Sequence, residues 1–202
     1  MKKRIVVAIS GASGVIYGTT LIKELLTHPI DVHVIITQAG RKIMAHELNH
    51  TGDVASFIKK DSTWSKHHEA RLIKHEEDDF FAPPASGSFR HQGMVVVPCS
   101  MKTLSAVAAG LAGNLLLRSA DVCLKERRPL ILVPRETPFS NIHIANMARA
   151  SGAGAIILPP APAFYFGPGT VQDIVNFVVG RILDQLGIEH ELVKEWGHEH
   201  EL

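Results

Sequence analysis

The chain has 202 residues, of which 46% are hydrophobic and 20% are charged, a composition that predicts one folded domain and excludes a disordered segment. Its formal net charge is only +1, which argues against nucleic acid or an anionic membrane surface as the main partner. Two cysteines are too few for a disulfide framework, and the N-terminal apolar run is too short for a signal peptide, so we expect a cytoplasmic protein.

Five short apolar segments predict the strands of a mainly parallel sheet: 4–9, 32–36, 94–97, 130–133 and 155–158, the last three each ended by a proline. Helical patterns follow at Val15 to Leu26, from the capping residue Thr37 through Leu48, and from Val171 to Leu186. This alternation predicts a single-domain α/β fold, a Rossmann-like three-layer sandwich. The stretch 53–90 is less regular and contains none of the five predicted strands, and its residues 82–88 are typical of a loop.

Ligands of such sheets bind beyond the carboxyl ends of the strands. The first strand is followed by small residues, from Ser10 to Gly14, which let the backbone approach a ligand. Their spacing matches neither GxGxxG nor the P-loop. A tight strand–helix turn without a ligand explains the same residues, so both interpretations stay open at this point.

Polar and aromatic residues follow the later strands. Three hydroxyls and Lys102 lie in the segment 98–105, where they can bind a phosphate or cap a helix. Arg135 and Glu136 follow the fourth strand, and the proline-rich segment 159–166 after the fifth carries aromatic side chains. Together these groups predict a site for an aromatic cofactor that bears a phosphate.

Several segments carry a specific family resemblance in a fixed order. They are ISGASGVIYG at 9–18, APPASGSF at 82–89, PCSMKTLSAVAAG at 98–110, ADVCLKERRPLILVPRETPFS at 120–140, ILPPAPAFYFGP at 157–168 and VNFVVGRILDQLGI at 175–188. The chain thereby resembles the UbiX family of flavin prenyltransferases. The resemblance predicts one flavoprotein domain over 1–196 and a polar tail over 197–202.

The resemblance implies an enzyme that joins the dimethylallyl group of dimethylallyl phosphate to reduced FMN and releases phosphate, without a metal ion. The product, prenylated FMN, then serves a partner decarboxylase. The resemblance also implies a homo-oligomer, in which trimers assemble into a dodecamer and sites are shared between subunits.

Site residues carried over from the family fall into two sets. The residues implied to contact FMN are Gly11, Ala12, Ser13, Thr37, Ser100, Met101, Lys102, Thr103 and Arg135. Those implied to meet prenyl phosphate are Ser88, Lys125, Arg135, Tyr165 and Arg181, with Glu47, Glu136 and Trp196 lining the same cavity. The family often has Ser in place of Thr37, so the hydroxyl is retained.

The residue types suit the chemistry. Departure of phosphate from an allylic carbon leaves negative charge on the leaving oxygens, which cations such as Lys125 stabilise. Proton movements are also needed, for which Glu136 and Ser13 are the candidates. We expect Glu47 to organise the phosphate end.

A rival motif, HExxH, spans His46 to His50 and is typical of zinc proteases on a helix. With 12 histidines in the chain and no third ligand at a recognisable spacing, we predict no metal site. We also expect His67, His68, His75 and the histidines of the tail to be solvated, and Cys99 and Trp64 to have packing roles.

Two other functions compete with prenyl transfer. One is an FMN-dependent cysteine-decarboxylase-type flavoprotein, and the other is a non-catalytic FMN-carrying subunit of an aromatic-acid decarboxylase. Cysteine decarboxylases carry PASANT-like and PxMNxxMW-like segments where this chain has 98–103 and 134–141. Arg135 and Glu136 suit phosphate handling better. The donor's form, monophosphate or diphosphate, stays open.

Overall fold

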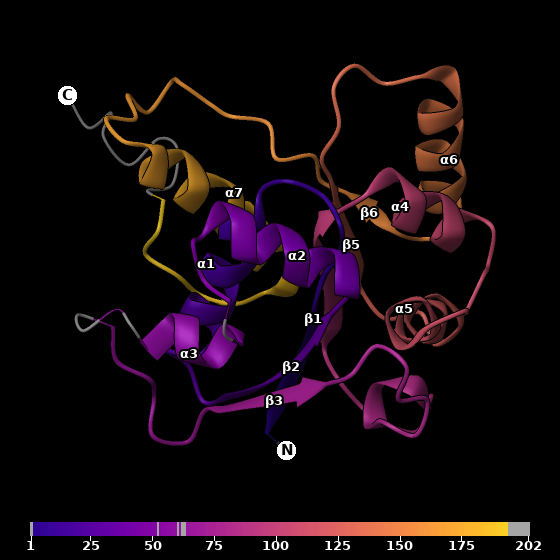
Figure 1. The fold of residues 1–202 in the computed structure, drawn as a ribbon, viewed down its shortest axis with the longest axis horizontal. Helices are drawn as coiled ribbons and strands as arrows, with labels where there is room; N and C mark the ends of the chain where they lie inside the picture. The colour runs from indigo at the N-terminus through magenta and orange to yellow at the C-terminus, as the bar shows by residue number, and fades with distance from the viewer. Residues whose placement is uncertain (1, 52, 60, 62–63, 194–202) are drawn as a thin grey trace.

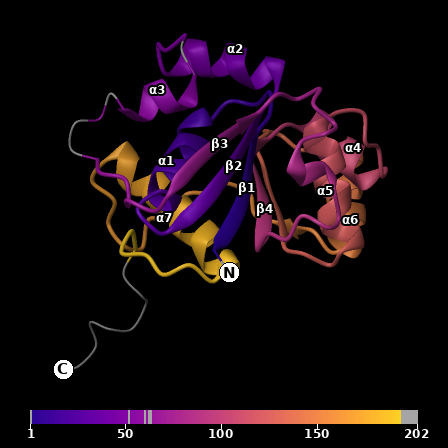
Figure 2. The same ribbon diagram turned by 90° about the horizontal axis from the view of Figure 1, so that it is seen from below.

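The computed structural model describes residues 2–51, 53–59, 61 and 64–193. In this part of the chain, one sheet of parallel strands lies between two layers of helices (Figures 1 and 2), which confirms the predicted three-layer α/β sandwich. The buried strand residues pack against helices on both faces, as continuous apolar strands require.

The sheet contains β1 (Lys3–Ile9), β2 (Ile30–Ile36), β3 (Arg71–His75), β4 (Gly93–Cys99), β5 (Leu130–Pro134) and β6 (Ile156–Ile157). Their order is β3-β2-β1-β4-β5-β6, and all neighbouring strands pair in parallel. The chain order reverses between β1 and β4. A crevice is expected at that point, beyond the carboxyl ends of the two strands.

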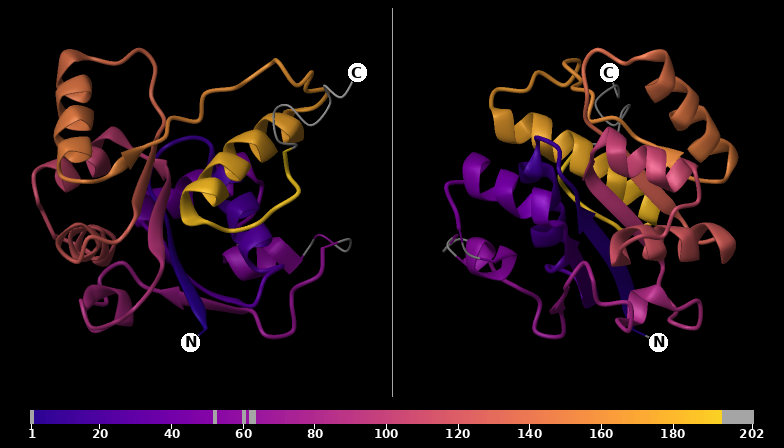
Figure 3. Two further views of the ribbon diagram at one scale, coloured as in Figure 1. Left: turned by 180° about the vertical axis from the view of Figure 1, so that it is seen from behind. Right: turned by 45° about the vertical axis from the view of Figure 1, so that its right-hand side comes forward.

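The helices are α1 (Val15–Leu25), α2 (Gln38–Glu47), α3 (Val54–Lys59), α4 (Met101–Ala108), α5 (Leu115–Lys125), α6 (Asn141–Gly152), α7 (Val171–Leu186) and the 3-10 turn η1 (Pro83–Ala85). Figure 3 shows α1, α2, α3 and α7 on one side of the sheet and α4, α5 and α6 on the other. Within the described part of the chain, none of these helices has both the length and the apolar character needed to cross a bilayer.

Two expectations about the strands were wrong. The stretch 53–90 contains the edge strand β3, which the apolar pattern missed because only Leu72 and Ile73 among its five residues are apolar. Pro98 was expected to end its strand, but β4 continues to Cys99. The pairing register shifts between Val96 and Cys99, so the missing N–H of Pro98 is accommodated at an irregularity of the ladder.

The predicted helix ends are confirmed. Thr37 caps α2 by accepting a hydrogen bond from the N–H of Gly40 at 3.0 Å. Gly187 ends α7 in the left-handed conformation, with φ of 62°, where glycine carries no steric penalty.

Candidate active site

Ser10 ties the loop after β1 to the end of β4. Its Oγ donates to the carbonyl of Pro98 at 3.0 Å and accepts from the N–H of Ser100 at 2.8 Å. Ser10 is only 1% exposed, and its bond to Pro98 is buried while its bond to Ser100 is part-buried, so the loss of either bond is costly. We call the surface that Ser10 organises the cradle, defined as residues 10–14, 37, 100–103 and 135.

Two glycines let the first helix and its neighbours approach closely. A Cβ at Gly11 would lie 2.6 Å from the Cβ of Ala39, and one at Gly18 would lie 2.5 Å from the carbonyl oxygen of Val97. Packing alone therefore accounts for these two glycines, so they do not by themselves indicate a ligand. Ala12 is buried beside them, and Ser13 is exposed at the tip of the loop.

Glu47 occupies the start of α1. Its Oε2 accepts from the N–H groups of Gly14 at 2.9 Å and Val15 at 3.1 Å, although it lies at the end of α2. A carboxylate is favoured there because the first turn of a helix carries partial positive charge. The amides considered for a ligand's phosphate are thus held by a side chain of this protein, and that side chain lies beside Ser13.

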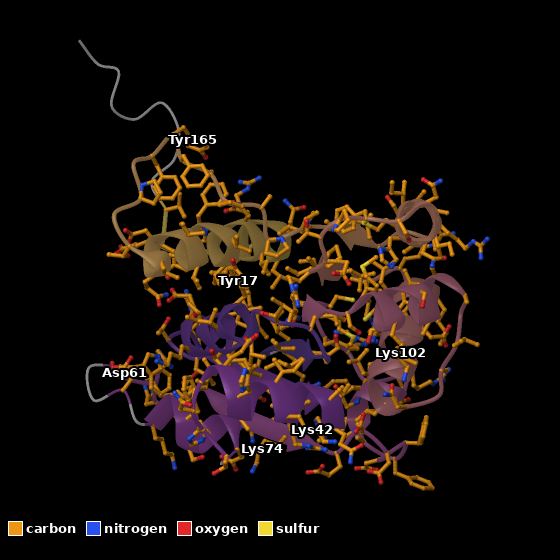
Figure 4. The ribbon with its side chains drawn as sticks, turned by 45° about the horizontal axis from the view of Figure 1, so that its top comes forward. Tyr17, Lys42, Asp61, Lys74, Lys102 and Tyr165 are labelled. Carbon is orange, nitrogen blue, oxygen red and sulfur yellow. The ribbon has the colours of Figure 1, made fainter. Side chains whose placement is uncertain are left out.

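The hydroxyls after β4 act as helix caps, which is one of the two uses that the sequence left open. Ser100 Oγ accepts from the N–H of Thr103 at 3.2 Å and donates to the Thr103 hydroxyl at 3.0 Å. Met101 and Thr103 are half-buried on the first turn of α4, whereas Lys102 is exposed. Figure 4 shows Lys102 on the α4 and α5 side of the molecule, away from α7.

Arg135 carries an unsatisfied buried donor. Its backbone N–H donates to the carbonyl of Cys99 at 3.2 Å, which holds it next to the end of β4. Its Nε is buried and has no hydrogen-bond partner within the described residues. An unpaired buried guanidinium N–H is costly, so this position fits a ligand that brings an acceptor. Glu136 follows as an exposed side chain, and its Oε1 accepts from the N–H of Thr137 at 3.0 Å.

Tyr165 and Arg181 lie on the α7 side of the molecule. Tyr165 is 61% exposed and packs edge-on against Phe166 and Phe177, with ring centroids 5.8 and 6.0 Å apart. Arg181 is exposed on α7 and pairs with Asp184 at 2.6 Å. In Figure 4, Tyr165 is at the outer end of this layer, and Tyr17 lies between α7 and α1.

Ser88 and Lys125 lie near the amino ends of the strands, whereas the cradle lies at their carboxyl ends. Lys125 ends α5, ahead of the first residue of β5, and it pairs with Glu126. A Cβ at Gly87 would lie 2.8 Å from Lys125 Nζ, so the loop that carries Ser88 contacts the end of α5. Arg128 fixes this loop through the carbonyls of Gly87 and Phe89, at 2.5 and 2.7 Å.

We call Ser88, Lys125, Glu126 and Arg128 the distal cluster. One chain therefore holds its predicted site residues in separate places: the cradle with Glu47 and Glu136, the α7 pair, and the distal cluster. Trp196 and the predicted tail 197–202 lie outside the described residues.

The HExxH segment is used for packing and capping. His46 is exposed, Glu47 binds α1, and His50 is buried with its Nε2 at 2.9 Å from Ser56 Oγ. Over the described ranges, no group of three or more His, Cys, Asp or Glu side chains is arranged to hold a metal ion.

Two histidine predictions were wrong. His67 is half-buried rather than solvated. His75 is half-buried rather than solvated, and its Nε2 lies 2.8 Å from Nδ1 of His33 on the neighbouring strand. Burial, with a smaller contribution from His75, lowers the pKa of His33 to about 4. His33 was missed because it interrupts an otherwise apolar strand, and that interruption was the available signal.

The packing roles predicted for Cys99 and Trp64 are confirmed. Cys99 is fully buried, and burial raises the pKa of its thiol, which makes it a poor nucleophile. Trp64 packs against the core, and its Nε1 donates to the carbonyl of Lys23 at 3.2 Å.

Comparisons with known proteins all match this chain to flavoproteins. The family model described as Flavoprotein matches residues 1–183. Flavin prenyltransferase UbiX of Methanocaldococcus jannaschii is 49% identical over 96% of this chain and 98% of its own length. The dodecameric FMN-dependent UbiX-like decarboxylase of Escherichia coli has a TM-score of 0.86 and 40% identity, covering 96% of this chain and 98% of that one. AnUbiX (PadA1), solved in complex with FMN and dimethylallyl pyrophosphate, also has a TM-score of 0.86, with 39% identity over 97% of this chain and 98% of that one.

Proposed function

The chain belongs to the UbiX family of flavin prenyltransferases, and we infer that it transfers a dimethylallyl group from dimethylallyl phosphate to reduced FMN. The carbon–oxygen bond to phosphate would break, the allylic carbon would bond to the flavin, and the displaced flavin proton would pass to Glu136 while phosphate leaves as an anion. The observation that supports this proposal is the buried Nε of Arg135 next to the end of β4, which has no hydrogen-bond partner among the described residues and so provides a place for a polar acceptor of a bound flavin.

FMN, when bound, supplies an electron-rich ring that can attack an allylic carbon. We propose that the cradle holds it: the loop of Gly11, Ala12 and Ser13 would face the ring. Thr37, Ser100, Met101, Lys102, Thr103 and Arg135 would provide the remaining contacts. The bonds of Ser10 to Pro98 and Ser100 fix the loop after β1 relative to the end of β4. The entropy cost of ordering these segments when FMN binds should therefore be small.

The leaving phosphate needs cations and donors. We propose that Lys125, Arg135 and Arg181 neutralise its developing charge, with Tyr165 and Ser88 donating hydrogen bonds. Trp196 would line the same cavity. Aromatic side chains near the allylic carbon would exclude water and stabilise positive charge by about 0.5–2 kcal/mol.

Proton transfer falls to groups at the cradle's rim. Glu136 is exposed next to Arg135 and can accept the proton that the flavin loses on alkylation. Ser13 would orient the reacting edge of the flavin. Glu47, held by the amides of Gly14 and Val15, would keep negative charge beside Ser13 and orient the phosphate end.

Assembly would unite the parts of the site. We propose that the chain forms a trimer-based dodecamer in which the distal cluster of one subunit faces the cradle of another. The separation of Lys125 from Arg135 within one chain supports this arrangement, since both are required near one phosphate. We further propose that the product serves a prenyl-FMN-dependent decarboxylase in the cytoplasm, and that residues 1–196 form the catalytic domain.

The test is anaerobic incubation with reduced FMN and either dimethylallyl phosphate or its diphosphate, followed by mass analysis of the flavin. We expect the mass of the flavin to increase by one prenyl unit only when a prenyl donor is present. Arg135→Met should abolish flavin binding, whereas Arg149→Met, on the exposed surface of α6, should not.

Two other outcomes would overturn the proposal. Unmodified flavin with decarboxylation of a peptidyl cysteine would indicate a cysteine decarboxylase. Tight flavin binding with neither reaction would indicate a carrier subunit.

A further inference from the structure

The chain doubles back along α7 after that helix ends at Gly187. Figures 1 and 3 show the segment after α7 running back beside it, toward its start. His190 lies against the helix there: a Cβ at Gly180 would lie 2.9 Å from His190 Cε1 and 3.0 Å from Val193 Cγ2. Glycine at position 180 therefore makes room for the His190 ring.

The hydrogen bonds of His190 define its tautomer. The backbone N–H of Leu192 lies 3.2 Å from His190 Nδ1, and because an N–H can only donate, Nδ1 must be the acceptor. The proton of the neutral ring is then on Nε2, which donates to Asp184 Oδ1 at 3.1 Å. The His190 side chain is only 8% exposed, so this donor is fixed and shielded.

Asp184 uses its two oxygens for two partners. Oδ1 accepts from His190, and Oδ2 accepts from Arg181 Nη1 at 2.6 Å. An exposed ion pair one helical turn apart would contribute little by itself, because both side chains lose freedom in forming it. Here the buried His190 ring already holds the Asp184 carboxylate in place, so forming the ion pair with Arg181 costs less side-chain entropy.

We propose that Asp184 and His190 are positioning residues for Arg181. This rests on the proposed function, in which Arg181 binds the phosphate of the prenyl donor. Guanidinium has five N–H donors, and Asp184 engages one nitrogen only, which leaves the others for phosphate oxygens. A guanidinium held in one orientation binds the phosphate with less loss of rotamer entropy.

The test compares His190→Ala, His190→Gln and Gly180→Ala in the assembled protein. We expect His190→Ala to raise the KM for dimethylallyl phosphate about tenfold, with kcat and FMN affinity changed less than about twofold. Glutamine can place an amide N–H near the position of Nε2–H, so His190→Gln should restore most of the loss. Gly180→Ala should resemble His190→Ala, because the added methyl displaces the ring without removing a polar group. His68→Gln, at an exposed histidine, is the matched control.

Equilibrium binding of dimethylallyl phosphate to the FMN-loaded protein keeps this inference apart from the proposed function. If the wild type binds the donor without transferring it, the proposed function fails, and weaker binding by His190→Ala still supports the positioning role. If His190→Ala binds the donor as tightly as the wild type, the inference is overturned. It is also overturned if all three variants lose FMN affinity in proportion to their thermal stability, or if the wild type binds no donor.

Discussion

The cradle and the distal cluster differ in how they are held together. The cradle is fixed by short bonds between strand ends, such as the two made by Ser10 and the caps made by Thr37 and Ser100. The distal cluster is a loop against the end of a helix, with Lys125 and Glu126 exposed on its surface. We propose the first region as the flavin-binding surface, whereas the ion pair of Lys125 in the second region is exposed and open to a further partner. This difference points to assembly as the step that completes the site.

The largest expected effect comes from breaking the distal cluster while keeping the cradle. Lys125→Ala should lower prenyl transfer about a hundredfold or more, since it removes a cation from the leaving phosphate. FMN affinity, measured by fluorescence titration, should not change. Lys59→Ala, at an exposed lysine of α3, is the control.

Mixed oligomers make that experiment sharper. Co-assembly of Lys125→Ala with Arg135→Met should recover part of the activity, because some sites draw an intact cradle from one subunit and an intact lysine from the other. No recovery at any mixing ratio would mean that each chain builds its site alone.

Breaking the cradle should first affect stability. Ser10→Ala leaves the part-buried N–H of Ser100 without its acceptor and the buried carbonyl of Pro98 without this donor, which should lower the free energy of unfolding by about 1–3 kcal/mol. Urea denaturation measures this, with Ser65→Ala at an exposed position as the control. A change as small as the control's would contradict the role given to Ser10.

Acid should destabilise the loop of the distal cluster before it affects the cradle. His33 packs edge-on against Phe89, in the loop that carries Ser88, with ring centroids 4.9 Å apart. His33, His75 and His91 all have pKa values lowered by burial, that of His33 to about 4, and Arg4 and Asp31 also act on His33. The unfolded chain takes up a proton near pH 6.5 and the folded chain does not, so stability falls as pH drops from about 6.5 toward 4.

The loss attributable to His33 should reach at most about 2 kcal/mol by pH 5. Hydrogen exchange at pH 7 and pH 5, corrected for the slower intrinsic exchange at the lower pH, should show a loss of protection in residues 86–91 before any change at 98–103. His33→Asn should flatten this dependence. An equal loss of protection in residues 86–91 and 98–103 would contradict the expected difference between the distal cluster and the cradle.

The smallest of these effects belongs to Glu136. Glu136→Gln should slow prenyl transfer about tenfold and leave FMN binding intact, because the carboxylate is exposed and water can replace part of its role as a base. Single-turnover kinetics with reduced FMN measure it, and Glu191→Gln is an exposed control. Unchanged kinetics would take Glu136 out of the proton path.

Local signals in the sequence predicted most of the fold and part of the site. Apolar runs located five strands, and Thr37 and Gly187 located helix ends, because these features depend on neighbours in the chain. The edge strand β3 escaped because its half-exposed residues do not form an apolar run.

Site geometry depends on contacts that no local pattern encodes. Glu47 at the end of α2 binds Gly14 at the start of α1, and the backbone bond from Arg135 to Cys99 places Arg135 next to the end of β4. The family resemblance named Ser88 and Lys125, but only the fold shows that one chain keeps them away from the cradle.

The carboxylate at the start of α1 has a consequence for selectivity among small molecules. Dinucleotides and nucleoside triphosphates are held in many α/β proteins by placing their phosphates on this helix end. Here such a molecule would have to displace Glu47 from Gly14 and Val15 and would meet its negative charge. Abundant adenine nucleotides would therefore be poor competitors, and a flavin whose single phosphate is bound elsewhere could occupy the cradle in their presence.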